Sequence, residues 1–582
     1  MNFASVSNKN WIFKKYNNNK ALQISEKFSL KEITSRLLAI RNIEIEDINL
    51  FLNPTIKNTM PNPFKILDMQ NAVSRTTIAI NNKETIGVFG DYDVDGAAST
   101  ALLFKYFKSI NQNVKTYIPD RKKDGYGPNI IAFNKLIDAG CKIIITVDCG
   151  TSSIKPINYA QKNGIDVIVL DHHQSDIVLP KAHSIVNPNR IGDKSNLNYL
   201  CAAGVCFMFL AALNNKLKNL NWFSKNNTTE PNLLNFLDLV CLGTICDVVP
   251  LVDLNRAIVS QGLKIIKNRT NLGLKTLYDI CNIENQPSTY HIGYLLGPRI
   301  NAGGRVGKSS YGVELLTSNN FQETYKIANY LNNYNKERQN IEKTLLTEVI
   351  EQAEKNKNDP VLFLYGNSWH EGVIGIIASR IKDKYNKPAF IISLNEREGK
   401  GSARSIFGFD VGSAIIAAQQ LGTIIKGGGH KMAGGFSIKK ERINEFKDFL
   451  IKRFNKINLE SLKLNDFYLD ATISPSALNE EFYNEISLLS PFGPGNLEPT
   501  FVIEDLKIIN ASVVGDKHIR TIMNGKNGEI VKAIAFNSKG GILEGYLSNS
   551  NKKKLNIAGK LSRNVWRGKK NIEFIIQDIA LK

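Results

Sequence analysis

The chain has 582 residues, 43% of them hydrophobic, so it is long enough for roughly three or four domains with buried cores. Its 74 Lys and Arg residues against 54 Asp and Glu residues give a net charge of +20, which favours a polyanionic partner such as nucleic acid, although a general compositional bias would give the same number. No segment approaches the roughly 18 to 20 apolar residues of a membrane span, which excludes a membrane-spanning helix.

The cysteine pattern and the N-terminus indicate a reducing compartment. The seven cysteines form no CxxC pair and lie mostly in apolar stretches, so we expect reduced core residues and no structural zinc. The first 20 residues, MNFASVSNKNWIFKKYNNNK, lack the apolar core of a signal peptide. We therefore expect a cytoplasmic protein that does not bind membranes.

The first half of the chain predicts an N-terminal segment followed by an α/β domain. Residues 1–68 are Asn-rich, weakly helical, and end in a stretch with three prolines. Within 69–255, short runs rich in Val and Ile at 84–90, 113–119, 141–147 and 165–170 alternate with segments of helical spacing. This alternation predicts βαβ units and a parallel sheet covered by helices on both faces.

The second half predicts a helical region and two further domains. Residues 231–265 have the pattern of an apolar helix, and 256–357 form a helical region that ends in a long amphipathic helix over 321–356. Residues 358–455 predict a smaller α/β domain. Residues 456–582 contain short alternating runs typical of a small β-barrel.

Polar residues follow the predicted strands of the first domain. GDYDVDG places Asp91, Asp93 and Asp95 after the first strand, while Asp148 follows the strand that ends at Val147. Asp171, His172 and His173 follow Leu170, and Asp247 lies near the end of a helical segment. Because the carboxyl ends of parallel strands meet at one edge, these side chains are expected to converge.

Such a cluster of carboxylates requires a compensating positive charge, since like charges a few ångströms apart cannot all remain ionised. Oxygen ligands with an imidazole suit Mn²⁺ or Mg²⁺, and two such ions could hydrolyse a phosphate ester. We predict His172 as a metal ligand and His173 as a contact or proton donor to the phosphate. For Asp91, a role as a helix N-cap is the alternative. The spacing of an EF-hand is excluded because position 102 is Leu.

The motifs GDYDVDG, VDCG, LDHH and CDVVP resemble the four motifs of the DHH phosphoesterase superfamily. Further motifs, including LGPRINAGGRVG, WHEGVIGIIASR and GGGH, are similar to those of the RecJ family of single-strand-specific exonucleases. The resemblance runs from about residue 70 to the C-terminus. It implies a DHH domain, a long connecting helix, a DHHA1 domain and an OB-type β-barrel.

The resemblance also implies an activity and partners. It implies a Mn²⁺- or Mg²⁺-dependent enzyme with two ions that degrades single-stranded DNA from the 5′ end to 5′-mononucleotides, in DNA repair and recombination. It further implies a monomer that works with a single-strand-binding protein and a helicase.

Specific residues match the motif positions. The resemblance places Asp93, Asp95, Asp148, His172 and Asp247 at metal-ligand positions, and Asp91 and His173 close to the metals or the phosphate as catalytic residues. Phe89 stands where some pyrophosphatase-like members carry a ligand His, which disfavours that branch, and Asp124 stands where Glu is expected.

Several basic and glycine-rich motifs are candidates for binding the DNA strand. Arginine forks bind phosphate bidentately, glycine lets the backbone approach a phosphate, and an aromatic side chain can stack on a base. We expect LGPRINAGGRVG to be a glycine-rich loop and Arg380 to end its helix. The candidate substrate-binding residues are Arg121, Tyr126, Arg299, Asn301, Arg305, His370, Arg380, Ser402, Arg404, Gly428, Gly429, His430 and Trp566. Ordinary surface turns, solvated arginines and a core tryptophan remain the alternative for these motifs.

Two other functions fit part of this pattern. A phosphodiesterase for oligoribonucleotides or cyclic dinucleotides would share the DHH and DHHA1 domains, but such proteins are usually shorter and lack a C-terminal barrel. A non-catalytic single-strand-binding factor is disfavoured by the intact acids and His172.

Overall fold

The computed structural model describes residues 4–121, 123–125, 127–284, 286–457, 465–548, 554–566 and 569–581. Tyr126 and the side chain of Trp566 lie outside this description. The chain divides into two compact units: the first contains residues 1–60, 250–261 and 465–582, and the second contains 61–249 and 262–464.

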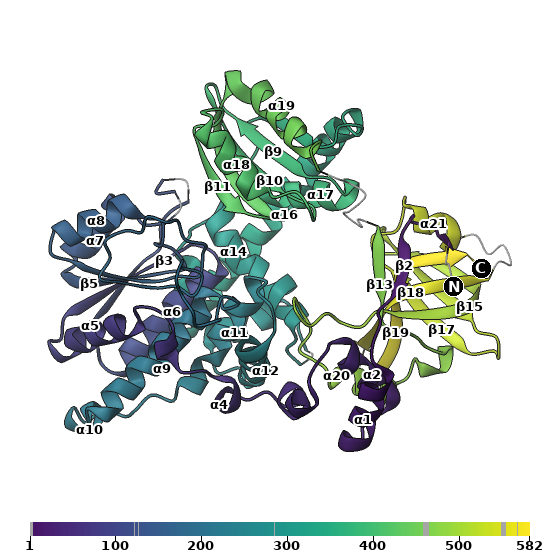
Figure 1. Cartoon of the computed structure of the whole chain (residues 1–582), viewed down its shortest axis with the longest axis horizontal. Coiled ribbons are helices and arrows are strands. Elements are labelled where there is room, and N and C mark those ends of the chain that lie inside the picture. Colours follow the sequence, from purple (N-terminus) through teal and green to yellow (C-terminus); the bar gives the residue numbers. More distant parts are fainter. Residues whose placement is uncertain are drawn as a thin grey trace. The chain divides into compact units, whose positions relative to one another are not determined.

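The second unit begins with a parallel sheet of five strands in the order β4-β3-β5-β6-β7 (Figure 1). Its strands are β3 (Thr85–Gly90), β4 (Val114–Tyr117), β5 (Cys141–Val147), β6 (Asp166–Leu170) and β7 (Ser184–Val186). Val and Ile form these strands because the sheet is buried on both faces. The predicted parallel α/β domain is therefore confirmed.

Helices cover both faces of this sheet. Helices α7 (Ile130–Asp138) and α8 (Ile154–Lys162) pack on one face through a cluster that includes Phe133, Ile157 and Val169. Helices α5 (Met69–Asn81), α6 (Val94–Ser109) and α9 (Ala202–Asn219) lie on the other side in Figure 1. The carboxyl ends of β3, β5 and β6 consequently open at one edge of the domain.

The predicted single helix over 231–265 is wrong. The structure has η3 (Leu233–Phe236) and α11 (Leu237–Cys246), and a new helix, α12 (Asp253–Lys267), begins after Pro250. A proline lacks the N–H group that a helix interior requires, which accounts for the break. Asp247 is therefore the C-terminal cap of α11 rather than a residue within a longer helix.

The expected glycine-rich loop at 296–307 is also wrong. Residues 291–296 form a π-helical turn that continues into α14 (Gly297–Val306), followed by α15 (Tyr311–Thr317), while α13 (Leu272–Ile280) precedes them. The glycines serve close packing, since a Cβ on Gly304 would lie 2.8 Å from the carbonyl oxygen of Tyr92. Glycine therefore allows α14 to approach the backbone that follows β3.

The predicted long helix is confirmed as α16 (Phe321–Lys355), which the Asn320 side chain caps by accepting a hydrogen bond from the backbone N–H of Glu323. It leads into a sheet with the order β11-β12-β10-β9-β8. These strands are β8 (Leu362–Asn367), β9 (Ala389–Leu394), β10 (Glu398–Arg404), β11 (Lys426–His430) and β12 (Ala433–Lys439). Helix α17 (Ile374–Tyr385) packs on one face, and α18 (Val411–Gln420) and α19 (Ile443–Phe454) pack on the other.

The C-terminal strands of the first unit form a closed barrel, as expected for an OB-type domain. The ring β15-β16-β17-β19-β18 closes because β18 pairs with both β15 and β19. Its strands are β15 (Phe501–Val514), β16 (His518–Asn524), β17 (Ile530–Ala535), β18 (Leu555–Trp566) and β19 (Lys569–Leu581). Helices α20 (Glu480–Ser487) and α21 (Ile542–Leu547) accompany it.

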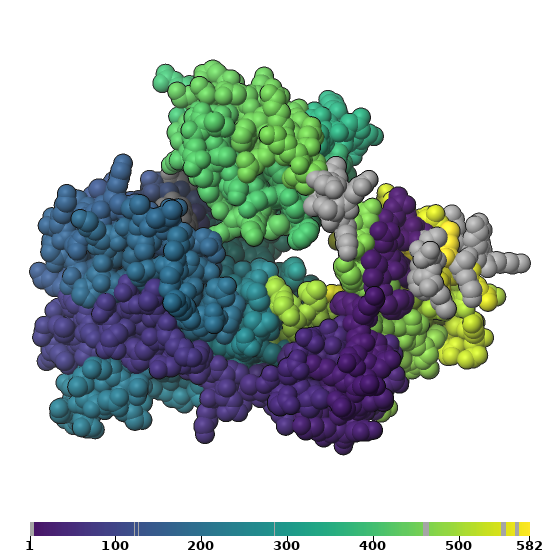
Figure 2. Space-filling view, in the orientation of Figure 1, coloured from purple at the N-terminus to yellow at the C-terminus, as the bar shows by residue number. Residues whose placement is uncertain are grey.

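The N-terminal segment completes the barrel unit. Strand β1 (Ala4–Ser5) pairs with β19, and β2 (Asn10–Phe13) pairs with β13 (Asp466–Leu469). Helices α1 (Asn18–Phe28) and α2 (Glu32–Ile40) share a hydrophobic cluster with the barrel strands. Figure 2 shows the purple surface of this segment against the yellow-green surface of the barrel.

Arg256, in the first turns of α12, holds residues 250–261 in the barrel unit. Its guanidinium group donates hydrogen bonds to the carbonyl oxygens of Phe51, Leu489, Ser490 and Pro491 at 2.8–3.3 Å. The same group stacks on the Phe51 ring at 3.8 Å from its centroid. One buried arginine thus joins three separate segments of the sequence.

The part of the chain that the structure describes contains no helix with the length and hydrophobicity of a membrane span.

Candidate metal centre and strand-binding surface

The first group of site residues follows β3. Asp91 is buried at the end of the strand, and Asp93 caps α6, its Oδ1 accepting a hydrogen bond of 3.0 Å from the backbone N–H of Gly96. The capping role considered for Asp91 therefore belongs to Asp93. Asp95 lies in the first turn of α6, and its carboxylate accepts hydrogen bonds from the backbone N–H groups of Ala202 and Ala203 at the start of α9.

Asp148 occupies the tight turn after β5. Its φ of 60° is left-handed, and its side chain is buried. At Gly150 a Cβ would lie 2.5 Å from the Thr146 hydroxyl oxygen, so the turn requires glycine there. The turn thereby directs the Asp148 carboxylate into the protein at the edge of the sheet.

The two histidines after β6 are held by Asp171, a residue to which the strand-end pattern assigned no role. One oxygen of its carboxylate accepts hydrogen bonds from the backbone N–H groups of His172 and His173 and lies 2.8 Å from Nδ1 of His173. Asn187 and Asn189 donate hydrogen bonds to the carbonyl oxygens of the same two histidines. The signal in the sequence that could have identified Asp171 is its place as the Asp of the DHH motif.

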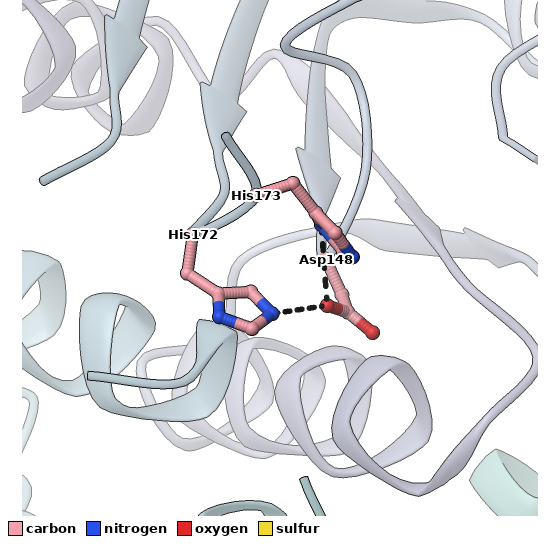
Figure 3. Close-up of side chains that lie close together, drawn as sticks. All are labelled: Asp148, His172 and His173. Atoms are coloured by element: carbon pink, nitrogen blue, oxygen red, sulfur yellow. Dashed lines mark ion pairs between the residues drawn. The ribbon is translucent and has the colours of Figure 1, made fainter. Parts of the chain in front are cut away.

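The side chains from these elements converge as predicted. His172 Nε2 lies 3.3 Å from Oδ1 of Asp148 and 3.9 Å from Oδ2 of Asp95, and His172 Nδ1 lies 3.6 Å from Oδ2 of Asp247. His173 Nδ1 is 4.0 Å from Oδ1 of Asp148. Figure 3 shows both imidazoles directed toward the Asp148 carboxylate.

Three sets of these side chains bring one potential ligand atom each within 4.8 Å of one another. The sets are Asp91, Asp93 and Asp148; Asp95, His172 and Asp247; and Asp148, His172 and His173. All five predicted metal ligands therefore belong to at least one set. Asp148 and His172 each belong to two, which places them between the groups.

The protonation of the cluster reflects crowding of negative charge. Burial, followed by repulsion from Asp93, raises the pKa of Asp95 to about 6 and holds the pKa of Asp91 well above its usual range. Burial, with repulsion from Asp95 and Asp93, raises the pKa of Asp247 to about 9. The same causes raise the pKa of Asp148 well above its usual range. A bound cation would relieve this repulsion.

Two buried atoms without hydrogen-bond partners also favour a bound cation. Nε2 of His172 and Oδ1 of Asp91 have almost no solvent exposure, and neither has a hydrogen-bond partner among the described residues. Burial, followed by the charge of His173, lowers the pKa of His172 to about 4, so its imidazole is neutral and offers a lone pair. Oxygen atoms with one imidazole nitrogen match the donor preferences of Mn²⁺ and Mg²⁺.

Residues of the smaller α/β domain, 358–455, approach this centre within the second unit. The rings of His173 and His430 lie 6.2 Å apart and nearly parallel, at 16°. His430 ends β11, next to Gly428 and Gly429, and a Cβ on Gly429 would lie 2.3 Å from the carbonyl oxygen of Ala433. The glycine-rich hairpin thus allows the two strands to approach closely beside the candidate centre.

Helix α14 connects the centre to the smaller α/β domain. The Asn301 side chain accepts a hydrogen bond of 3.2 Å from the backbone N–H of Val94, directly after Asp93. Arg305 donates a hydrogen bond of 2.9 Å to the carbonyl oxygen of Gly372, whose own N–H donates to Nδ1 of His370. Arg121 stacks on Tyr92 at 5.4 Å from the ring centroid.

Four other predicted contact residues have different surroundings. Arg299 bonds to the Leu295 carbonyl and to Asn332, on the side of α14 that faces α16. Ser402 and Arg404 lie on β10 and are joined by a hydrogen bond of 3.3 Å. The expectation that Arg380 ends its helix is wrong, because α17 continues to Tyr385 and Arg380 instead pairs with Glu342 of α16.

Three family models match the chain. The model described as "DHH family, N-terminal domain" matches residues 85–244, the "DHHA1 domain" model matches 358–456, and the "RecJ OB domain" model matches 469–578.

Known relatives match over nearly the whole chain. The "Single-stranded-DNA-specific exonuclease RecJ" of Bacillus subtilis (strain 168) is 31% identical over 99% of this chain and 71% of its own length. The protein of the same description from Escherichia coli (strain K12) is 32% identical over 91% of this chain and 92% of its own length.

Solved structures share the fold. RecJ from Thermus thermophilus in complex with Mn²⁺ is similar with a TM-score of 0.80 and 24% identity, over 98% of this chain and 79% of that one. A structure of exonuclease RecJ bound to manganese is similar with a TM-score of 0.58 and 28% identity, over 69% of this chain and 98% of that one.

Proposed function

Because this chain belongs to the RecJ family of single-stranded-DNA-specific exonucleases, we propose that it is a metal-dependent exonuclease of single-stranded DNA. The observation that carries this conclusion is the convergence of Asp91, Asp93, Asp95, Asp148, His172 and Asp247 at one edge of the parallel sheet. The chain combines this centre with the DHHA1 and RecJ OB domains. A phosphodiesterase of dinucleotides alone would not need the additional barrel.

We infer that the centre holds two Mn²⁺ or Mg²⁺ ions. Asp93 and Asp148 would hold one ion, with Asp91 beside them, and Asp95, His172 and Asp247 would hold the other, as their potential ligand atoms are grouped. Two divalent ions held there would supply a water activated at neutral pH and positive charge that stabilises the phosphodiester during its hydrolysis. The Mn²⁺ and Mg²⁺ complexes of the similar T. thermophilus RecJ support this choice of metals.

His173 and Asp91 are the proposed catalytic residues of the chain itself. Asp171 orients the His173 ring through Nδ1, and we propose Nε2 as the atom that donates a hydrogen bond to a phosphate oxygen. Burial lowers the pKa of His173, but the hydrogen bond and charge of Asp171 outweigh this and raise it to about 9. Asp91 has the buried, unsatisfied oxygen of the cluster and is placed to exchange a proton beside the phosphate.

Basic and glycine-rich residues of both domains would hold the strand. Arg305, Arg404 and His430 lie on three elements that meet near the centre, and guanidinium groups bind phosphate in a bidentate manner. The proposed direction, from the 5′ end with release of 5′-mononucleotides, rests on family resemblance. So do roles in DNA repair and recombination, a monomeric state, cytoplasmic location, and cooperation with a single-strand-binding protein and a helicase.

A digestion time course tests this function. The purified chain with Mn²⁺ or Mg²⁺ is given 5′-labelled or 3′-labelled oligonucleotides, each as single strands and as blunt duplexes. We expect early release of labelled mononucleotide only from the 5′-labelled single strand. Early release of the 3′ label would overturn the direction, and tight DNA binding without hydrolysis would indicate a binding protein.

A further inference from the structure

The connecting helix α16 carries a row of polar side chains on one face. Asn332, Asn335, Arg338 and Glu342 are spaced by three, three and four residues, which places them along one side of a helix. Asn335, Arg338 and Glu342 are buried, with 3%, 9% and 8% of their surface exposed. Burial of such groups is costly unless they have partners, so each partner is informative.

Within the second unit, the row connects α14 to α17 of the DHHA1 domain. At one end Asn332 accepts a hydrogen bond of 3.0 Å from Nε of Arg299, on α14. In the middle Arg338 donates to Asn335 and to Oε2 of Glu342, the latter at 2.8 Å. At the other end Oε1 of Glu342 accepts from Nε of Arg380, on α17 of the DHHA1 domain, at 3.1 Å.

Positive charge accumulates around this row. Burial, followed by the charges of Arg121 and Arg338, lowers the pKa of Arg305 to about 10, and Arg404 acts in the same direction. Burial also lowers the pKa of Arg338, although Glu342 opposes this change. Arg305 and Arg338 therefore repel each other, and Arg121 stacks on Tyr92, directly after β3. A polyanion would relieve this repulsion.

The pair between Glu342 and Arg380 is not explained by stability alone. The Arg380 side chain is 61% exposed, whereas that of Glu342 is 11% exposed. Ion pairs with an exposed partner contribute little to folding, yet the Glu342 carboxylate is largely withdrawn from water. Its two oxygens fix one guanidinium group of α16 and one of α17. The arrangement therefore favours a role in orienting cations.

We propose that Glu342 is a positioning residue that orients the exposed Arg380 toward the phosphates of a bound single strand, while the buried Arg338 holds the Glu342 carboxylate in place. Arg380 of α17 thereby adds a cation to the strand-binding surface, and the buried polar row of α16 supports it. This inference rests on the proposed exonuclease function. It places the contact of Arg380 on nucleotides beyond the scissile bond, and Glu342 belongs to none of the metal-ligand sets found among the described residues.

The test compares Glu342→Gln with wild type on two substrates, a 20-nucleotide single strand and a dinucleotide. The variant keeps the shape of the side chain but removes its charge. We expect KM for the 20-nucleotide strand to rise about tenfold, with kcat changed less than about twofold. The dinucleotide should be hydrolysed at the wild-type rate, since by this proposal it is too short to reach Arg380. The dependence of log KM on log salt should decrease by about one.

Glu337→Gln is the matched control, because it removes the same charge from an exposed position of the same helix. Glu342→Asp, which retains a carboxylate, should recover part of the lost affinity. An increase in KM no larger than that of Glu337→Gln, or equal losses on both substrates, would refute the positioning role. A wild-type protein that hydrolyses neither substrate would instead refute the proposed function.

A double-mutant cycle with Arg380→Ala tests whether Glu342 acts through Arg380. Arg380 is exposed enough that its truncation should leave the fold intact. If Glu342 acts through Arg380, then Glu342→Gln should raise KM less in the Arg380→Ala background than in wild type. Additive effects would contradict the proposal, because the two residues would then act independently. If Glu342→Gln fails to fold, Arg338→Lys provides the measurement, because it keeps the charge but loses the bonds to Asn335, and should raise KM severalfold.

Discussion

Nδ1 of His173 lies 2.8 Å from Oδ1 of Asp171, and this contact gives two adjacent histidines different properties. The neighbouring His172 has no such bond at Nε2 within the described part of the chain, and this atom faces the carboxylates of Asp148 and Asp95. Burial raises the pKa of Asp171, but the bond and charge of His173 outweigh this and lower it below its usual range. Asp171 therefore remains an anion that orients one imidazole while the other faces the metal site.

Asp171→Asn should impair catalysis more than metal binding. An amide can no longer supply the charge that orients His173, so we expect kcat to fall about 10- to 100-fold. Stabilisation by Mn²⁺, measured as a shift in Tm, should remain. Asp176→Asn, an exposed acid of the same loop, is the control and should behave as wild type. Unchanged kcat in Asp171→Asn would contradict this role.

Asp148→Asn should abolish activity and stabilise the metal-free protein. Asp148 belongs to two of the three ligand sets, so its loss should reduce hydrolysis by about 10³-fold or more and weaken Mn²⁺ binding. In the metal-free protein the same change removes a buried, repelled carboxylate. Thermal unfolding with EDTA should therefore give a higher Tm than wild type. Asp138→Asn, an exposed acid at the end of α7, should change neither quantity.

Stabilisation by Mn²⁺ should be greater at pH 8 than at pH 6. The metal-free protein holds protons on Asp95 and Asp247, whose pKa values are raised to about 6 and about 9. Because these pKa values are raised in the folded protein, the metal-free fold is more stable at low pH and loses that stability as the pH rises through them. Metal binding must also displace the same protons, so it is weaker at low pH. Both effects increase the Mn²⁺-dependent shift in Tm with pH. A shift that is equal at both pH values would be inconsistent with protonated ligands.

Arg256→Met should destabilise the barrel unit by about 2–4 kcal/mol, because four carbonyl groups lose their shared donor. Urea unfolding followed by intrinsic fluorescence measures this change. Lys264→Met removes an exposed cation from the same helix and should cost less than about 0.5 kcal/mol. Equal midpoints for the two variants would mean that Arg256 does not join the segments.

Local sequence patterns predicted the secondary structure where burial is uniform. The strands β3, β5 and β6 are continuous apolar runs, and α16 has a regular charged face, so periodicity was sufficient. The pattern gave a wrong prediction at LGPRINAGGRVG, because several glycines in a short stretch usually mark a loop. There they allow a helix to approach Tyr92, a contact more than 200 residues distant in sequence.

Short-range patterns were enough to predict the parallel sheet, the residues at its strand ends and their chemistry, because alternating strands and helices bring those ends to one edge. They could not predict that Asp171 orients His173, that Glu342 joins Arg338 to Arg380, or that Arg256 ties α12 to the barrel unit. Each of these contacts depends on the direction of a side chain in the folded protein. Local periodicity indicates the face on which a residue lies, but not the group that it meets there.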